Sequence, residues 1–190
     1  MLPPQPQFAI LYRARMILMR LIIVTIILIA SVLLEAIFVG HMSIFGVTPY
    51  LMLPIITSYS ILRGDTEGAI VGFTGGLLQD IVLGQALGLF AMLGLLVGYF
   101  AGKPFRDFFR ESYLLPMLIT GVIATIYGFT VYIFNSLTIA PINMFHHIGT
   151  VILPATVYTM IISLIVYRII YAINALLEFF ERRRRKIFER

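Results

Sequence analysis

The chain alternates between long apolar stretches and short segments that hold most of its charged side chains. Six apolar stretches lie at residues 17–39, 47–62, 67–83, 86–102, 114–136 and 148–172. The first, fifth and sixth are long enough to cross the roughly 30 Å hydrocarbon core of a bilayer with some tilt. The other three lie near the lower limit of about 17 residues for a spanning helix. The pattern predicts an all-α membrane protein built as a bundle of about six transmembrane helices.

The middle stretches allow a second arrangement. Residues 67–102 also fit a re-entrant hairpin in a chain with four spans, which keeps both termini on the same side of the membrane. Pro54 lies inside the second stretch and predicts a kink there. The carbonyl freed by Pro54 is expected to find a donor on a neighbour such as Ser58 or on another helix.

The basic residues predict the orientation. The three connections expected outside the cell, at residues 40–46, 84–85 and 137–147, contain no lysine or arginine. With six spans, all 14 basic residues lie at or near the cytoplasmic ends: Arg13, Arg15, Arg20, Arg63, Lys103, Arg106, Arg110, Arg168, Arg182, Arg183, Arg184, Arg185, Lys186 and Arg190. The positive-inside rule therefore places both termini in the cytoplasm.

Composition agrees with a membrane location. Hydrophobic residues make up 60% of the chain and charged residues 12%, with a mean hydropathy of +0.99. A soluble domain carries about 25% charged residues. The net charge of +5 sits in clusters beside apolar runs, which indicates juxtamembrane anchoring rather than nucleic-acid binding. The absence of cysteine excludes disulfides and thiolate metal sites.

The pattern divides the chain into a six-span domain at residues 1–172 and a basic cytoplasmic tail at residues 173–190. Glu178 and Glu181 precede Arg182 and Arg185 at helical neighbour spacing, so the sixth helix is expected to continue into the tail. The basic run is expected to bind anionic lipids or dock a cytoplasmic partner, and it consists of Arg182, Arg183, Arg184, Arg185 and Lys186.

Glycine is concentrated in the third and fourth stretches, where ten of the 15 glycines fall between Gly64 and Gly102. Many recur at intervals of four residues, which places them on one helix face and lets another backbone approach closely. The spacing predicts tight packing between these two helices, with an interface to a partner or to a second copy as the alternative. The glycines assigned to this packing or partner interface are Gly72, Gly76, Gly84, Gly88 and Gly98.

Apart from Glu67 at the first position of the third stretch, two acidic residues lie within the predicted spans. Asp80 follows Gln79 near the outer end of the third stretch, and it is expected either to cap the start of the fourth helix or to bind a partner. Glu35 lies in the first stretch with no basic residue at its depth, and it is expected to be protonated or solvated near the outer interface.

Three segments of this central region carry a resemblance: Gly75-Gly-Leu-Leu-Gln-Asp80, then Leu87-Gly88-Leu-Phe-Ala91, and Leu95-Leu-Val-Gly-Tyr99-Phe-Ala-Gly102. In their order and spacing they resemble the rod shape-determining protein MreD family. Carried over by position, the matched residues are Gly76, Gln79, Asp80, Gly84, Leu87, Gly88 and Tyr99. The resemblance implies a multi-pass protein of the bacterial inner membrane, with a fold like the substrate-binding components of energy-coupling-factor vitamin transporters.

The resemblance also implies a role and partners. MreD-like proteins work in the machinery that inserts lateral peptidoglycan, together with the single-span protein MreC, the filament protein MreB, the glycosyltransferase RodA and a class B penicillin-binding transpeptidase. The leading hypothesis is therefore a non-enzymatic scaffold that binds an MreC-like helix.

Two other functions compete with the scaffold. A vitamin-type transporter component would need a polar-lined cavity, for which Thr57, Ser58, Tyr59 and Asn135 are the candidate residues. An intramembrane enzyme has little support, because the histidines fit no zinc-binding pattern and are expected to be solvated in outer connections. They are His41, His146 and His147. We expect no cofactor and no metal.

Overall fold

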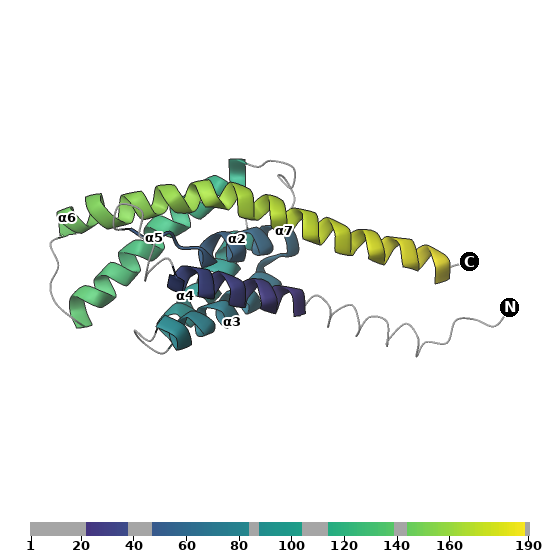
Figure 1. Cartoon of the computed structure of the whole chain (residues 1–190), viewed down its shortest axis with the longest axis horizontal. Coiled ribbons are helices and arrows are strands. Elements are labelled where there is room, and N and C mark those ends of the chain that lie inside the picture. Colours follow the sequence, from purple (N-terminus) through teal and green to yellow (C-terminus); the bar gives the residue numbers. More distant parts are fainter. Residues whose placement is uncertain (1–21, 38–46, 84–87, 104–113, 139–143, 189–190) are drawn as a thin grey trace.

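The computed structural model describes residues 22–37, 47–83, 88–103, 114–138 and 144–188, with side chains as far as Leu176. A first helix spans Ile22–Ile37. It is followed by α2 (Met52–Arg63), α3 (Asp65–Leu83), α4 (Leu89–Gly102), α5 (Leu114–Thr138), α6 (Met144–His147), the π-helical turn η1 (Ile148–Ile152) and α7 (Leu153–Phe188). Helices therefore occur in all six predicted stretches, as expected for an all-α bundle. Figure 1 shows the shorter helices gathered beside α5 and α7, with the end of α7 extending beyond them.

The bundle is apolar on its perimeter, and it buries polar side chains among the hydrophobic residues of its centre. Ile81, Phe100 and Val122 are 64%, 61% and 62% exposed, whereas Thr57 and Asp80 are 0% and 1% exposed. A water-soluble protein has the opposite distribution. Within the described residues, Leu114–Thr138 and Met144–Leu176 are long and apolar enough to cross a membrane.

The short helix α2 lies at the centre of the bundle, where it packs on α3, α4, α5 and α7. It is buried along almost its whole length, so its small polar side chains need partners inside the protein. The Thr57 hydroxyl bonds the Thr120 hydroxyl of α5 at 2.9 Å. Ser60 Oγ donates to the carbonyl oxygen of Gly98 in α4. These bonds fix α2 against two neighbouring helices.

The expected kink at Pro54 is wrong, because α2 begins at Met52 and Pro54 lies in its first turn. An amide hydrogen is not needed at that position, so proline fits without bending the helix. The Tyr50 carbonyl accepts a bond from the Leu53 amide at 3.3 Å, and Ser58 is not its donor. Ser58 Oγ is buried and makes no hydrogen bond in the described structure.

The helix α5 and the α6–α7 segment run antiparallel. A Cβ atom on Gly121 of α5 would lie 2.7 Å from the Met160 sulfur of α7, and one on Gly128 would lie 3.3 Å from Ile152. Nearer the other end of α5, the Tyr132 and His147 rings are 5.1 Å apart. As the residue number increases along α5 in these pairs, the number of the contacted residue in the α6–α7 segment decreases. The glycines let α5 lie close against the α6–α7 segment.

Candidate functional site

The helices α3 and α4 form a hairpin whose two backbones touch along a glycine seam. Gly68, Gly72 and Gly76 of α3 face Gly98, Gly94 and Phe90 of α4, in antiparallel order. A Cβ atom on Gly68 would lie 2.7 Å from the Gly98 carbonyl oxygen, and one on Gly72 would overlap the Gly94 carbonyl. This close approach is possible only with glycine. The predicted tight packing of the third and fourth helices is confirmed, and it lies within one molecule.

Asp80 closes the hairpin at its turn. Its Oδ2 accepts hydrogen bonds from the backbone amides of Gly88 and Ala91, and its Oδ1 accepts one from Phe90, all at 3.0 Å. The carboxyl group thus satisfies amides at the start of α4 and places negative charge at the helix N-terminus. Gly88 has φ +99°, a left-handed conformation that glycine adopts without strain. The expected capping role of Asp80 is confirmed.

Glu35 connects the first helix to this hairpin. Gln79 Nε2 donates a hydrogen bond to Glu35 Oε2 at 2.7 Å. Glu35 is 6% exposed and Gln79 is 4% exposed. Of the two states expected for Glu35, solvation near the outer interface is therefore wrong, and protonation stays a prediction. An acid in an apolar stretch needs a polar partner, and Gln79 is the amide that supplies one.

Tyr99 lies at the opposite end of the hairpin, near the end of α4. Lys103 Nζ donates to the Tyr99 hydroxyl at 2.7 Å and stands 4.5 Å from the centre of its ring. This hydrogen bond raises the pKa of Lys103. Phe100 packs edge-on against Tyr99, with the ring centres 5.4 Å apart. Lysine and aromatic side chains together are typical of the boundary between hydrocarbon and water.

Comparison with known proteins places the chain in a family. The rod shape-determining protein MreD family matches residues 14–177, which include the hairpin, Asp80 and the helices on both sides of it. The chain belongs to the MreD family. MreD proteins reside in the inner membrane and act in rod shape determination. No curated protein and no solved structure matches the chain, so the likeness to energy-coupling-factor transporter components has no support from a solved fold.

The polar side chains considered for a transport cavity do not converge in this MreD chain. Thr57 bonds Thr120, while the Tyr59 hydroxyl donates to Glu67 at 3.3 Å. Asn135 lies near the end of α5 and is half-buried. A set of residues pointing to different helices does not line one ligand chamber.

The remaining predicted residues lie partly among the described side chains and partly outside them. His146 and His147 lie in α6 rather than in a loop, and the described residues contain no cluster of three potential metal ligands. The helix α7 continues to Phe188, which confirms the helical continuation into the tail. Other positions lie outside the described side chains, and their roles stay predictions: Gly84, Leu87, His41, Arg182, Arg183, Arg184, Arg185 and Lys186.

Proposed function

We propose that this MreD protein is a six-span scaffold of the cell-wall elongation complex, with both termini in the cytoplasm. It helps maintain rod shape by binding an MreC-like single-span protein, and through that partner it associates with MreB, RodA and a class B penicillin-binding transpeptidase. The basic tail holds the cytoplasmic end against anionic lipid. Membership of a shape-determining family of the inner membrane supports this role.

The observation that carries the scaffold proposal is the use of Asp80, Gln79 and Glu35 as links between helices. Placing a polar side chain inside a membrane costs free energy. Each of these three side chains forms a hydrogen bond with another part of the bundle. The glycine seam adds direct backbone contact between α3 and α4. Together they make a stiff hairpin, which is what a docking surface for another helix requires.

The glycines of the seam are already covered by the facing helix of the hairpin, so the partner helix meets the outer face of α4. Met92 and Phe100 are each 61% exposed, and Leu95 and Leu96 lie between them at 39% and 38% exposure. Tyr99 ends this face at the membrane boundary. A homodimer would also have to use a surface other than the seam, since Gly72, Gly76 and Gly98 face within the hairpin.

The positions of the cations support the proposed orientation. Arg63 ends α2 and Lys103 follows α4. Ser60 of α2 contacts Gly98 of α4 near these ends, so both cations lie at the same end of the bundle. This shared end supports the proposed orientation, because the positive-inside rule gathers basic residues on the cytoplasmic side.

A cavity between the first helix, α2, α3 and α7 measures about 30 Å³. Small-molecule sites usually enclose about 300 Å³ or more. This observation favours the scaffold over a vitamin-binding transporter component.

The scaffold proposal is tested by co-expressing the full chain with an MreC-like partner and recovering the complex in mild detergent. Met92 and Val122 are matched in exposure, at 61% and 62%, but lie on α4 and α5. We expect Met92→Trp to reduce recovery of the partner about tenfold, equivalent to about 1.4 kcal/mol, because the larger ring separates the packed helices. Val122→Trp should leave recovery unchanged. Equal recovery from both variants, or no partner with the unsubstituted chain, would contradict the proposal.

A further inference from the structure

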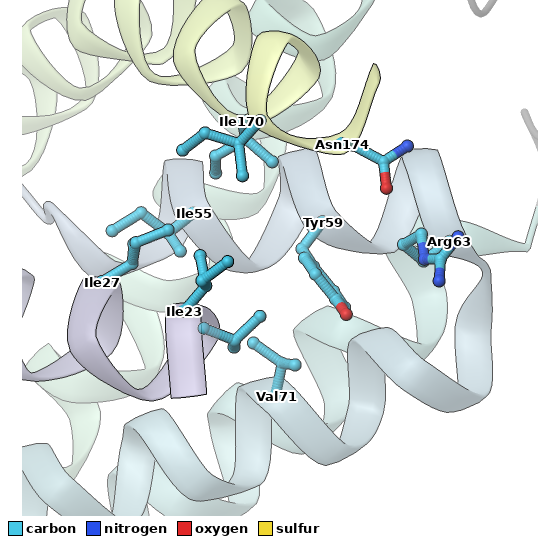
Figure 2. Close-up of a pocket in the computed structure, with 10 residues that line it drawn as sticks. Ile23, Ile27, Ile55, Tyr59, Arg63, Val71, Ile170 and Asn174 are labelled. Carbon is cyan, nitrogen blue, oxygen red and sulfur yellow. The ribbon is translucent and has the colours of Figure 1, made fainter. Parts of the chain in front are cut away.

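The side chains of α7 mark two boundaries of the membrane. Figure 2 shows Asn174 of α7 beside Arg63, so this part of α7 lies at the end of the bundle that holds the cations. Arg168, which is exposed, comes between one and two turns before Asn174. A lipid-facing stripe of exposed aliphatic residues precedes it at every fourth position: Leu153, Val157, Ile161 and Ile165. Gly149 continues this stripe and lies about 28 Å from Arg168 along the helix, close to the thickness of the hydrocarbon. Gly149 is therefore at the opposite head-group boundary.

The π-helical turn η1 leaves backbone carbonyl groups at this boundary without their helical donors. The Leu153 amide donates to the Ile148 carbonyl oxygen, five residues back, and not to the Gly149 carbonyl as in an α-helix. The next residue, Pro154, has no amide hydrogen. The amides that would reach the Gly149 carbonyl in α- and π-helical geometry are therefore both lost. Pro154 also removes the α-helical donor of Thr150, and its ring explains the wide turn, because proline clashes with the carbonyl group four residues before it.

The Gly149 carbonyl group lies in open surroundings beside an aromatic ring. Gly149 is exposed, and a Cβ atom on it would meet no described atom within 4 Å. Phe145, four residues earlier, is 89% exposed. Thr150 Oγ1 donates to the His146 carbonyl oxygen at 2.7 Å, so residues four apart remain neighbours across this turn. An acceptor oxygen beside the negative face of a ring suits a cation that donates hydrogen bonds.

We propose that Phe145 and the carbonyl groups of Gly149 and Thr150 bind the ammonium group of phosphatidylethanolamine. This ammonium group carries three N–H donors, whereas the choline of phosphatidylcholine is equally positive but has none. The Phe145 ring attracts both head groups, and the free carbonyl groups distinguish them. The acyl chains lie along the exposed stripe that begins at Leu153. The inference rests on α7 crossing the membrane, as in the proposed function, and it depends neither on the orientation nor on an MreC-like partner.

Native mass spectrometry of the full-length protein tests the head-group preference. The detergent-purified chain is titrated separately with palmitoyl-oleoyl phosphatidylethanolamine and palmitoyl-oleoyl phosphatidylcholine, which have the same net charge and the same acyl chains. We expect the unsubstituted chain to bind phosphatidylethanolamine about fivefold more tightly, the effect of one net hydrogen bond. Pro154→Ala restores an amide donor to α7 and should abolish this preference in a folded protein. Pro116→Ala is the matched control, because Pro116 lies in the first turn of α5, where no amide hydrogen is needed, and it should keep the preference.

The aromatic ring has its own pair of variants. Phe145→Leu keeps an apolar side chain but removes the ring, so it should weaken the binding of both lipids about twofold to fivefold and leave their ratio unchanged. Phe100→Leu makes the same change at an exposed position near the cation end of the bundle and should have no effect.

Three results would contradict the ammonium site. Equal binding of the two lipids by the unsubstituted chain, or a preference that persists in Pro154→Ala, would overturn the role of the carbonyl groups. Equal lipid binding by Phe145→Leu and Phe100→Leu would overturn the role of the ring. Loss of MreC-like partner recovery in Pro154→Ala, without any lipid preference in the unsubstituted chain, would assign the carbonyl groups to a protein donor instead. Failure of partner recovery alone would count against the scaffold and leave the lipid site standing.

Discussion

Asp80→Asn is the substitution whose consequence follows most directly from the structure. The two oxygens of Asp80 accept three backbone hydrogen bonds at 3.0 Å. An asparagine amide has one oxygen, so its best placement keeps the bonds from Gly88 and Ala91 and turns its NH₂ group toward the Phe90 amide. One buried amide without an acceptor costs about 1–3 kcal/mol. Loss of negative charge at the helix N-terminus adds about 0.3–1 kcal/mol.

The expected loss for Asp80→Asn is therefore about 1–4 kcal/mol in the free energy of unfolding. At about 2–4 °C per kcal/mol for a chain of this size, the melting temperature in detergent should fall by about 2–16 °C. Asp65→Asn is the matched control, because Asp65 accepts a bond from the adjacent Thr66 amide at an exposed helix start. Asparagine and aspartate cap such positions almost equally well. If Asp80→Asn melts at the same temperature as the Asp65→Asn control, the capping argument is refuted. A normal melting temperature together with loss of the partner would assign Asp80 to partner binding.

Two further substitutions test other contacts of the hairpin. Gly72→Ala would force a methyl group onto the Gly94 backbone, so we expect the free energy of unfolding to fall by about 3 kcal/mol or more. The amount of folded protein on size-exclusion chromatography should then fall sharply. Gly149→Ala is the control, because a Cβ atom there meets no atom within 4 Å, and this variant should elute normally. A normal Gly72→Ala profile would mean that the two backbones are not in contact. Glu35→Leu should leave the Gln79 amide without its acceptor and reduce the stability by about 1–3 kcal/mol. Glu35→Gln keeps an acceptor for that amide, so its stability should fall less. Thermal unfolding measures both variants. Equal stability of the two Glu35 variants would show that the bond to Gln79 contributes nothing.

The sequence predicted the features whose signals are local. Glycines four residues apart on two consecutive helices indicated the seam, because helical periodicity places them on single faces. Asp80 lies 8 to 11 residues before the three amides it caps, so the cap belongs to the same short segment. The position of an acid just before a glycine turn predicted these bonds as one of two possible roles, with partner binding as the other.

Contacts between distant parts of the chain were harder to predict. Glu35 and Gln79 are 44 residues apart, and Thr57 and Thr120 are 63 residues apart. Hydropathy gives the depth of each residue but not the direction in which its side chain points. The expected kink at Pro54 failed for a related reason. The residue before α2 is Leu51, which makes no side-chain cap, so no polar residue marks where that helix begins.

The topology of the hairpin is tested most directly by cysteine accessibility, which is simple here because the chain has no cysteine of its own. Single variants Gln85→Cys and Lys186→Cys are treated in intact cells with a maleimide that does not cross the membrane. We predict labelling of Gln85→Cys from outside and labelling of Lys186→Cys only after the cells are opened. Labelling of Lys186→Cys in intact cells would invert the orientation, and protection of Gln85→Cys would replace two spans by a re-entrant hairpin.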